Sequence, residues 1–314
     1  MCPIVRITCS LALLPRPCAS CATMPYKLPN SNVATPPIAK KFKPRPLLGV
    51  DTDACKSKVP APSAEITGHF DWSCDLWLTV DVETHELAPP TQWSWEVGQF
   101  KHLRRKVDPK ALASLRVVQL GWTVGGLDPE HVPVTKELLV KPVGFQISTA
   151  AMRIHHINQE QAETEGVDLH DALTQFLKDV KTVVGKNGRV AAHNLEFDAC
   201  VIFAELRRAG MGEDDLCNWA HAVEGGMCTM DPYLTGWCCA EYLADRAMSA
   251  PNNMPYRLNP VGLDALLMVL GVDRQVECHP AHNAGPDSRG VWIALGHLHR
   301  IVRGSGHVGS QEKQ

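Results

Sequence analysis

The order of apolar segments predicts an α/β protein in which helices pack on a mixed β-sheet. Runs of strand length come first, at residues 76–83, 114–124 and 136–140, and segments with helical spacing follow, alternating with short strands. Such an order places helices against a sheet. The chain has 314 residues, of which 45% are hydrophobic, so it can bury a sizeable core.

The first strand, residues 76–83, ends in two acids. Side chains alternate between the faces of a strand, so Val80 and Val82 line one face while Asp81 and Glu83 share the other. Two carboxylates on one face repel each other unless a cation neutralises them, and a divalent metal ion bound through oxygen is the usual solution. A solvated strand end would also accommodate both acids, so this stretch alone leaves both interpretations open.

A hairpin and a helix are predicted next. Residues 114–124 form a β-branched run that predicts a second strand, residues 136–140 predict a third, and the turn signal Gly125-Gly126 is expected to join them. Residues 168–183 then carry apolar side chains at helical spacing.

A second strand-to-helix unit carries another acid. Residues 190–192 predict a short buried strand, and residues 195–209 predict a helix that Gly210 closes. Asp198 lies early in this helix, at the sheet edge where sites form in open α/β proteins. An acid at a helix N-terminus is also favourable without any function.

The last two helices are expected at residues 262–270 and 287–302, the second stopped by Gly304. Asp287 shares a helical face with the apolar residues of the second helix, and a buried acid needs a partner. His282 lies in the loop before it and can accept a proton near neutral pH, although His279 is a local competitor for that role.

The remaining segments divide the chain into a tail, one domain and two insertions. Residues 1–66 are predicted to be a disordered extension, because the first fifty contain no Asp or Glu and many prolines. Residues 67–304 form the predicted domain, with insertions near 86–113 and 211–257, and residues 305–314 form a C-terminal tail. The basic, acid-poor start suits an organelle presequence, a nuclear address or a tail without function. We therefore expect an intracellular protein in the cytoplasm, nucleus or an organelle.

Charge and cysteine content exclude several classes of protein. The formal net charge is −3, so any surface for nucleic acid must be local. Among the twelve cysteines, only Cys18 and Cys21 and the pair Cys238-Cys239 are close in sequence. Structural zinc needs two such pairs at suitable spacing, so the cysteines are typical of reduced intracellular thiols. No apolar run approaches the length of a membrane span.

Three motifs in fixed order resemble the exonuclease motifs of the DEDDh, or DnaQ-like, 3′-5′ exonuclease family, which has a ribonuclease H-like fold. They are Asp-x-Glu on the first strand, His-Asn-x-x-Phe-Asp ending at Asp198, and His-x-x-x-x-Asp ending at Asp287. Residues 117–121 and 155–158 are similar to the second strand and the His-Gly-Ile-Thr segment of that family. The resemblance covers roughly residues 75–303.

The resemblance implies hydrolysis of single-stranded RNA or DNA from its 3′ end, releasing nucleoside 5′-monophosphates. Two Mg²⁺ or Mn²⁺ ions are the implied cofactors, and Asp81 would bridge them. His282 would orient or deprotonate the attacking water. The implied metal ligands are Asp81, Glu83, Asp198 and Asp287. The implied contacts to nucleic acid are Thr84, His85, Asn194 and Phe197.

Four departures from the family pattern concern the pocket rather than the metal ligands. They are Thr84-His85-Glu86 after the first motif, Gln119 where an acid is frequent, His156 in place of a glycine, and Pro286 before the last Asp. The alternative function is a catalytically weak DnaQ-like module for binding or scaffolding. The aromatic and basic residues Trp93, Trp95, Lys101 and 104–106 would stack on bases and bind phosphates, or else pack in the core and face solvent. No motif distinguishes RNA from DNA or indicates an oligomeric state.

Overall fold

The described part of the computed structural model is residues 59–60, 62–63, 66, 70–88, 92–94, 104–106, 109–128, 132–248 and 261–305. Within it, a five-stranded sheet has the order β5-β4-β1-β6-β7, and β2 and β3 form a separate pair. The strands are β1 (Leu76–Thr84), β2 (Gln92–Ser94), β3 (Arg104–Lys106), β4 (Val117–Gly126), β5 (Val134–Leu139), β6 (Arg189–Ala192) and β7 (Met227–Cys228). β1, β4 and β5 are antiparallel neighbours, whereas β6 is parallel to β1 and β7.

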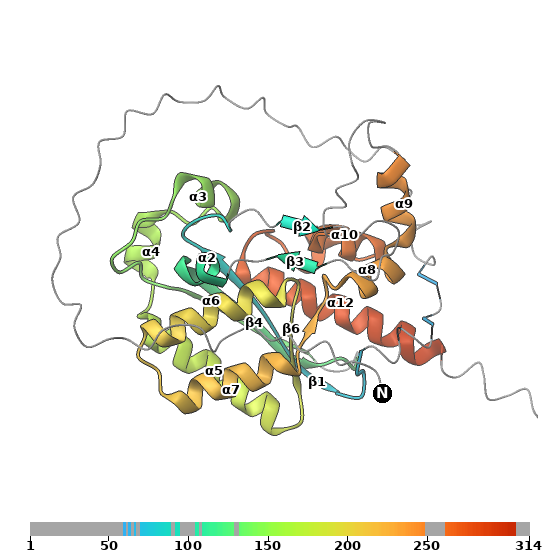
Figure 1. Cartoon of the computed structure of the whole chain (residues 1–314), viewed down its shortest axis with the longest axis horizontal. Coiled ribbons are helices and arrows are strands. Elements are labelled where there is room, and N and C mark those ends of the chain that lie inside the picture. The colour runs from blue at the N-terminus through green and yellow to red at the C-terminus, as the bar shows by residue number, and fades with distance from the viewer. Residues whose placement is uncertain are drawn as a thin grey trace, which may run out of the picture. The chain divides into compact units, whose positions relative to one another are not determined.

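Helices flank this sheet (Figure 1). They are α2 (Pro109–Ser114), α3 (Thr149–His155), α4 (Gln159–Glu165), α5 (Leu169–Gly185), α6 (Leu195–Arg208), α7 (Glu213–Glu224), α8 (Pro232–Cys238), α9 (Ala240–Met248), α10 (Leu263–Val269), α11 (Arg274–Glu277) and α12 (Ala284–Ser305). None of the helices in the described ranges has the length and apolar character needed to cross a membrane. The predicted mixed sheet flanked by helices is therefore confirmed.

The two faces of β1 point into two different cores, as its alternation predicts. Leu78, Val80 and Val82 pack in a cluster with α5, α6 and α7. Trp77 packs in a second cluster with apolar residues of α8, α10 and α12. Because Asp81 follows Trp77 on the same face, the acids of β1 emerge on the side of the sheet that α12 covers.

The ends of two elements differ from the sequence-based prediction. Gly125 and Gly126 form the last residues of β4, opposite Trp77 and Leu76, instead of a turn. The strand pairing itself overrides the local turn signal, because both glycines lie opposite β1. Gly304 does not stop the last helix, since α12 extends to Ser305.

Two segments that were expected to lie outside the core contain packed residues. In the predicted second insertion, β7 pairs with β6 and so forms an edge of the main sheet. In the predicted N-terminal tail, Ile66 is buried and the carbonyl oxygen of Pro60 accepts a hydrogen bond from Trp237 Nε1 at 2.9 Å. Packing therefore begins before the predicted boundary at residue 66. The proposed targeting segments lie outside the described residues.

The start of α12 is fixed on β1 and β4 by small and polar side chains. A Cβ atom on Gly121 would come within 2.0 Å of the backbone of Ala284, so only glycine allows this approach. Gln119 Oε1 accepts a hydrogen bond from the Ala284 N–H at 2.9 Å. Thr79 Oγ1 donates to the carbonyl oxygen of Ser288 at 2.7 Å. Gln119, which departs from the family pattern, thus caps the helix that carries Asp287.

Candidate active site

The end of β1 opens into a pocket of about 320 Å³ that α6, α10, α11 and α12 complete. All five residues predicted for metal binding and catalysis line this pocket: Asp81, Glu83, Asp198, His282 and Asp287. They come from three segments far apart in sequence. The pocket therefore lies where the three sequence motifs meet.

Burial and mutual repulsion raise the pKa values of the two acids of β1. For Asp81, burial is the largest cause of a pKa well above the usual range, and the charges of Asp198, Asp287 and Glu83 add to it. For Glu83, burial followed by the charges of Asp287 and Asp198 raises the pKa to about 8. The acids thus disfavour one another's charge, an effect that the charge of Arg274 opposes only in part at Asp81.

Asp198 reaches the pocket because β6 runs parallel to β1 and delivers the first turn of α6 to the same sheet edge. The side chain is buried, and its Oδ1 atom accepts a hydrogen bond from the Val82 N–H at 3.1 Å. This bond attaches α6 to the strand that carries Asp81. Asp198 consequently has a structural contact as well as its predicted role.

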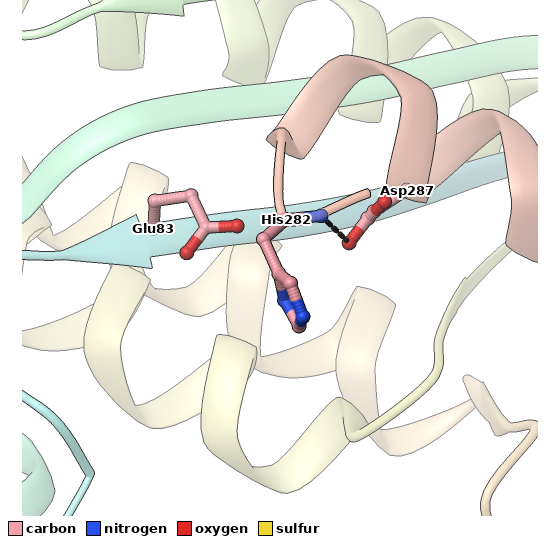
Figure 2. Close-up of side chains that lie close together, drawn as sticks. All are labelled: Glu83, His282 and Asp287. Atoms are coloured by element: carbon pink, nitrogen blue, oxygen red, sulfur yellow. Dashed lines mark hydrogen bonds between the residues drawn. The ribbon is translucent and has the colours of Figure 1, made fainter. Parts of the chain in front are cut away.

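Asp287 and His282 are joined by the turn that leads into α12. Asp287 Oδ2 accepts a hydrogen bond from the His282 N–H at 3.2 Å, and Figure 2 shows this turn facing Glu83. His282 has a φ of 56°, a left-handed conformation that non-glycine residues rarely adopt. One potential ligand atom each of Glu83, His282 and Asp287 lies within 4.8 Å of the others. His279, the competitor, is not part of the pocket lining.

The donor set fits a hard divalent cation. Carboxylate oxygens are the ligands that Mg²⁺ and Mn²⁺ prefer, and burial raises the pKa of Asp287 to about 6 despite the opposing effect of Arg274. A bound cation would remove the repulsion between the acids. Among the described residues, no cysteine belongs to a group that could hold a metal ion, and the cysteines there are free thiols.

The four residues predicted to contact nucleic acid separate into two pairs. Asn194 and Phe197 line the pocket. Thr84 and His85 are not part of its lining: Thr84 Oγ1 donates to the carbonyl oxygen of Glu86 at 2.7 Å, and His85 Nδ1 accepts from the Arg116 N–H at 3.2 Å. The Thr84 hydroxyl and the His85 ring are thereby held by backbone groups.

The aromatic and basic candidates around β2 and β3 cannot be placed at the pocket. Trp93 pairs with Arg105 through the backbone of β2 and β3. Trp95 and Lys101 lie outside the described residues.

Three further residues with ionisable side chains line the pocket that sequence analysis did not select as site residues. Arg274 and Asp264 belong to short helices without a recognisable motif, so no local signal marks them. His193 begins the second motif, and its ring nitrogens lie 3.0 Å from Thr229 Oγ1 and 2.9 Å from the carbonyl oxygen of Val261. Burial lowers the pKa of His193 to about 4, so this neutral ring fixes the chain just before α10.

No protein-family model and no curated protein matches the chain. The fold is similar to E. coli exonuclease I in complex with a dT13 oligonucleotide, with 16% identity over 73% of this chain and 42% of that chain and a TM-score of 0.49. A zinc-bound form of the E. coli exonuclease I complex with single-stranded DNA has 16% identity over 73% and 41%, with a TM-score of 0.47. Exonuclease I from Methylocaldum szegediense has 19% identity over 72% and 40%, with a TM-score of 0.42. This chain spans about two-fifths of those chains, and the likeness concerns the fold alone.

Proposed function

We propose that the protein is a metal-dependent 3′-5′ exonuclease that hydrolyses single-stranded nucleic acid to nucleoside 5′-monophosphates. One observation carries the proposal: acids from β1, α6 and α12 line one pocket together with His282. A fold that gathered these acids for stability alone would pair each with a cation, whereas here burial, and after it repulsion among the acids, raises the pKa values of Asp81 and Glu83.

Four carboxylates would hold the ions in this proposal: Asp81, Glu83, Asp198 and Asp287. When bound, two Mg²⁺ or Mn²⁺ ions would supply activation of the attacking water and neutralisation of the charge that develops on the scissile phosphate. His282 is exposed at the pocket, so one of its ring nitrogens would be accessible to accept the proton that the water loses.

The terminal nucleotide would lie against the start of α6. Phe197 offers an aromatic ring for base stacking, and Asn194 offers an amide that both donates and accepts hydrogen bonds. Neither contact selects RNA over DNA, which requires recognition of the 2′-hydroxyl. The proposed substrate class is therefore a single strand with a free 3′ end.

A binding module without turnover is the second candidate. The observation that favours it is the ion pair of Arg274 with Asp287, because a cationic side chain already contacts a proposed metal ligand. If that pair were permanent, the pocket would bind nucleic acid without cleaving it. The two candidates differ in whether bound strands become shorter.

The decisive experiment uses single-stranded DNA and RNA of equal sequence, labelled at the 5′ end, with Mg²⁺, Mn²⁺ or a chelator. The proposed function predicts a ladder that shortens one nucleotide at a time with metal and stays intact with chelator. A parallel substrate with a blocked 3′ end should resist digestion. Binding without shortening under all conditions would favour the second candidate, and internal cleavage of the blocked strand would contradict the first.

A further inference from the structure

Arg274 lies between two acids of the pocket. One guanidinium nitrogen is 2.5 Å from Asp264 Oδ1, and the other forms an ion pair with Asp287 Oδ1. The Arg274 side chain is 10% exposed and that of Asp287 is 11% exposed, whereas that of Asp264 is 69% exposed. Arg274 therefore contacts one buried acid and one solvated acid at the same time.

A divalent ion would oppose one of these two contacts more than the other. Five carboxylates and one guanidinium line the pocket, so with the histidines neutral the ionised groups carry a formal charge of −4. Two divalent cations would balance this charge whichever acid Arg274 contacts. The contact of Arg274 with Asp287, however, places a positive charge on a carboxylate that a divalent ion would need.

We propose that Arg274 is the resident counter-cation of Asp287, and that a divalent metal ion must displace it from that carboxylate in order to bind. The inference rests on the metal site of the proposed function and adds a residue that controls how readily the site is loaded. Arg274 keeps Asp264 as its partner after displacement. Metal loading thus exchanges a buried ion pair for metal coordination.

Removing the Arg274 guanidinium should change the metal affinity and the stability of the metal-free protein in opposite directions. Removing the guanidinium removes the competitor, so the metal ion should bind more tightly. Removing it also leaves Asp287 without its neutralising partner among other acids, so the metal-free protein should be less stable. If Arg274 only supported the fold, its substitution would lower both the metal affinity and the stability of the metal-free protein, because a distorted pocket holds the ion less well.

The test measures Mn²⁺ binding and melting temperature without any substrate. Arg274→Gln is compared with the wild type by isothermal titration calorimetry and by thermal denaturation in chelator. Arg289→Gln is the matched control, because Arg289 lies two residues from Asp287 on α12 but its Nε donates to the carbonyl oxygen of Glu277 outside the pocket lining. Arg274→Lys, which keeps a charge but loses the planar fork, is the conservative variant.

We expect Arg274→Gln to bind Mn²⁺ at least about 10-fold more tightly, since a charge at this distance typically changes ion binding to a carboxylate by that factor or more. Its metal-free melting temperature should fall by at least about 3 °C. Arg274→Lys should lie between wild type and Arg274→Gln in both measurements. Arg289→Gln should match the wild type in both.

The outcomes distinguish a failure of the role of Arg274 from a failure of the metal-dependent function on which that role rests. Weaker or unchanged Mn²⁺ binding by Arg274→Gln, with clear binding by the wild type, would overturn the role of Arg274 and leave the metal site intact. Binding by Arg274→Gln but not by the wild type would support the competition in its strongest form. If neither protein bound Mn²⁺, both the inference and the metal-dependent function would fail.

Discussion

Buried acids near the two ends of α6, Asp198 and Glu205, belong to surroundings that differ in how their charge is balanced. Glu205, near the end of α6, is fully buried, and its Oε1 atom receives hydrogen bonds from Arg116 Nε at 2.9 Å and from the Val117 N–H at 3.0 Å. Arg208 adds an ion pair at 2.9 Å. Arg116 and Val117 thereby tie α6 to the start of β4, whereas Arg208 lies on α6 itself. The Oε1 atom of Glu205 thus has the partners that a buried structural charge requires, whereas its Oε2 atom is buried without a hydrogen-bond partner among the described residues.

In the pocket, by contrast, acids repel one another although Arg274 pairs with Asp287 and the Val82 N–H donates to Asp198. Asp81, Glu83 and Asp287 have pKa values raised by burial, and repulsion between acids adds to this at Asp81 and Glu83. Among the described residues, Arg274 is the cation that forms ion pairs with this group, and its partners are Asp287 and Asp264. The difference teaches that burial alone does not mark a functional acid. The distinguishing feature is a buried carboxylate whose charge the protein itself leaves unbalanced.

The largest expected effect is on activity at the pocket. Asp81→Ala and Asp198→Ala should each lower the rate of strand shortening by at least about 10³-fold, because metal ions contribute several kcal/mol to the stability of the transition state. Gel assays with end-labelled strands measure this loss, and circular dichroism checks that both variants fold. Full activity in either variant would contradict the assignment of metal ligands.

A smaller loss is expected when only the proton acceptor is removed. His282→Ala leaves all four carboxylates in place, so it should bind Mn²⁺ and single strands like the wild type but act at least about 10²-fold more slowly. His279→Ala is the control, since His279 is not in the pocket lining. Should His279→Ala prove inactive and His282→Ala active, the third motif would have to be reassigned.

The neutralised acid should show the opposite pattern, with an effect on stability alone. Glu205→Gln keeps the shape but removes the charge that Arg116 and Arg208 contact. We expect the free energy of unfolding to fall by about 1.5–3 kcal/mol, as for the loss of hydrogen bonds to a charged group. Chemical denaturation measures this change, and metal affinity should stay the same. A Glu205 variant of unchanged stability would remove the basis of the comparison.

The smallest effect is a pH dependence of the metal-free protein. Glu83 has a folded pKa of about 8 against an ordinary value of 4.5, and Asp287 one of about 6 against 3.8. The raised pKa values mean that the folded state holds these protons more tightly than the unfolded state does. The resulting stabilisation of the folded state is present below the ordinary pKa values and is lost as pH rises through the folded-state pKa values. In chelator, the melting temperature should therefore fall between about pH 4 and pH 8. Saturating Mn²⁺ should oppose the fall, and a melting temperature that rises over this range would disagree with the raised values.

Sequence patterns predicted the parts of the site that depend on local geometry. The period of two along β1 sets Asp81 and Glu83 on one face, and the parallel arrangement of β6 beside β1 brings Asp198 to the same edge. These features follow from one strand or one strand-to-helix unit. The placement of all five predicted metal and catalytic residues around one pocket agrees with that analysis, while their roles remain predictions.

Other parts depend on how distant segments pack, which local patterns do not encode. Arg274 belongs to a four-residue helix, and its contact with Asp287 exists only because α11 packs beside the start of α12. Ile66 appeared to belong to a tail, yet it is buried in the cluster that contains Trp72 and Trp237. Thr84 and His85 follow the first motif, but backbone contacts hold both away from the pocket lining.

The central claim is that the acids around Asp81 gather to hold a ligand rather than to stabilise the fold. The most direct measurement is the melting temperature of the wild type and Asp81→Asn at pH 8, each in chelator and in Mn²⁺. We predict that Asp81→Asn melts at or above the wild type in chelator, because one repelling charge is gone, and that Mn²⁺ raises the melting temperature of the wild type far more than that of the variant. A variant that melts well below the wild type in chelator, together with a wild type that does not respond to Mn²⁺, would contradict the account.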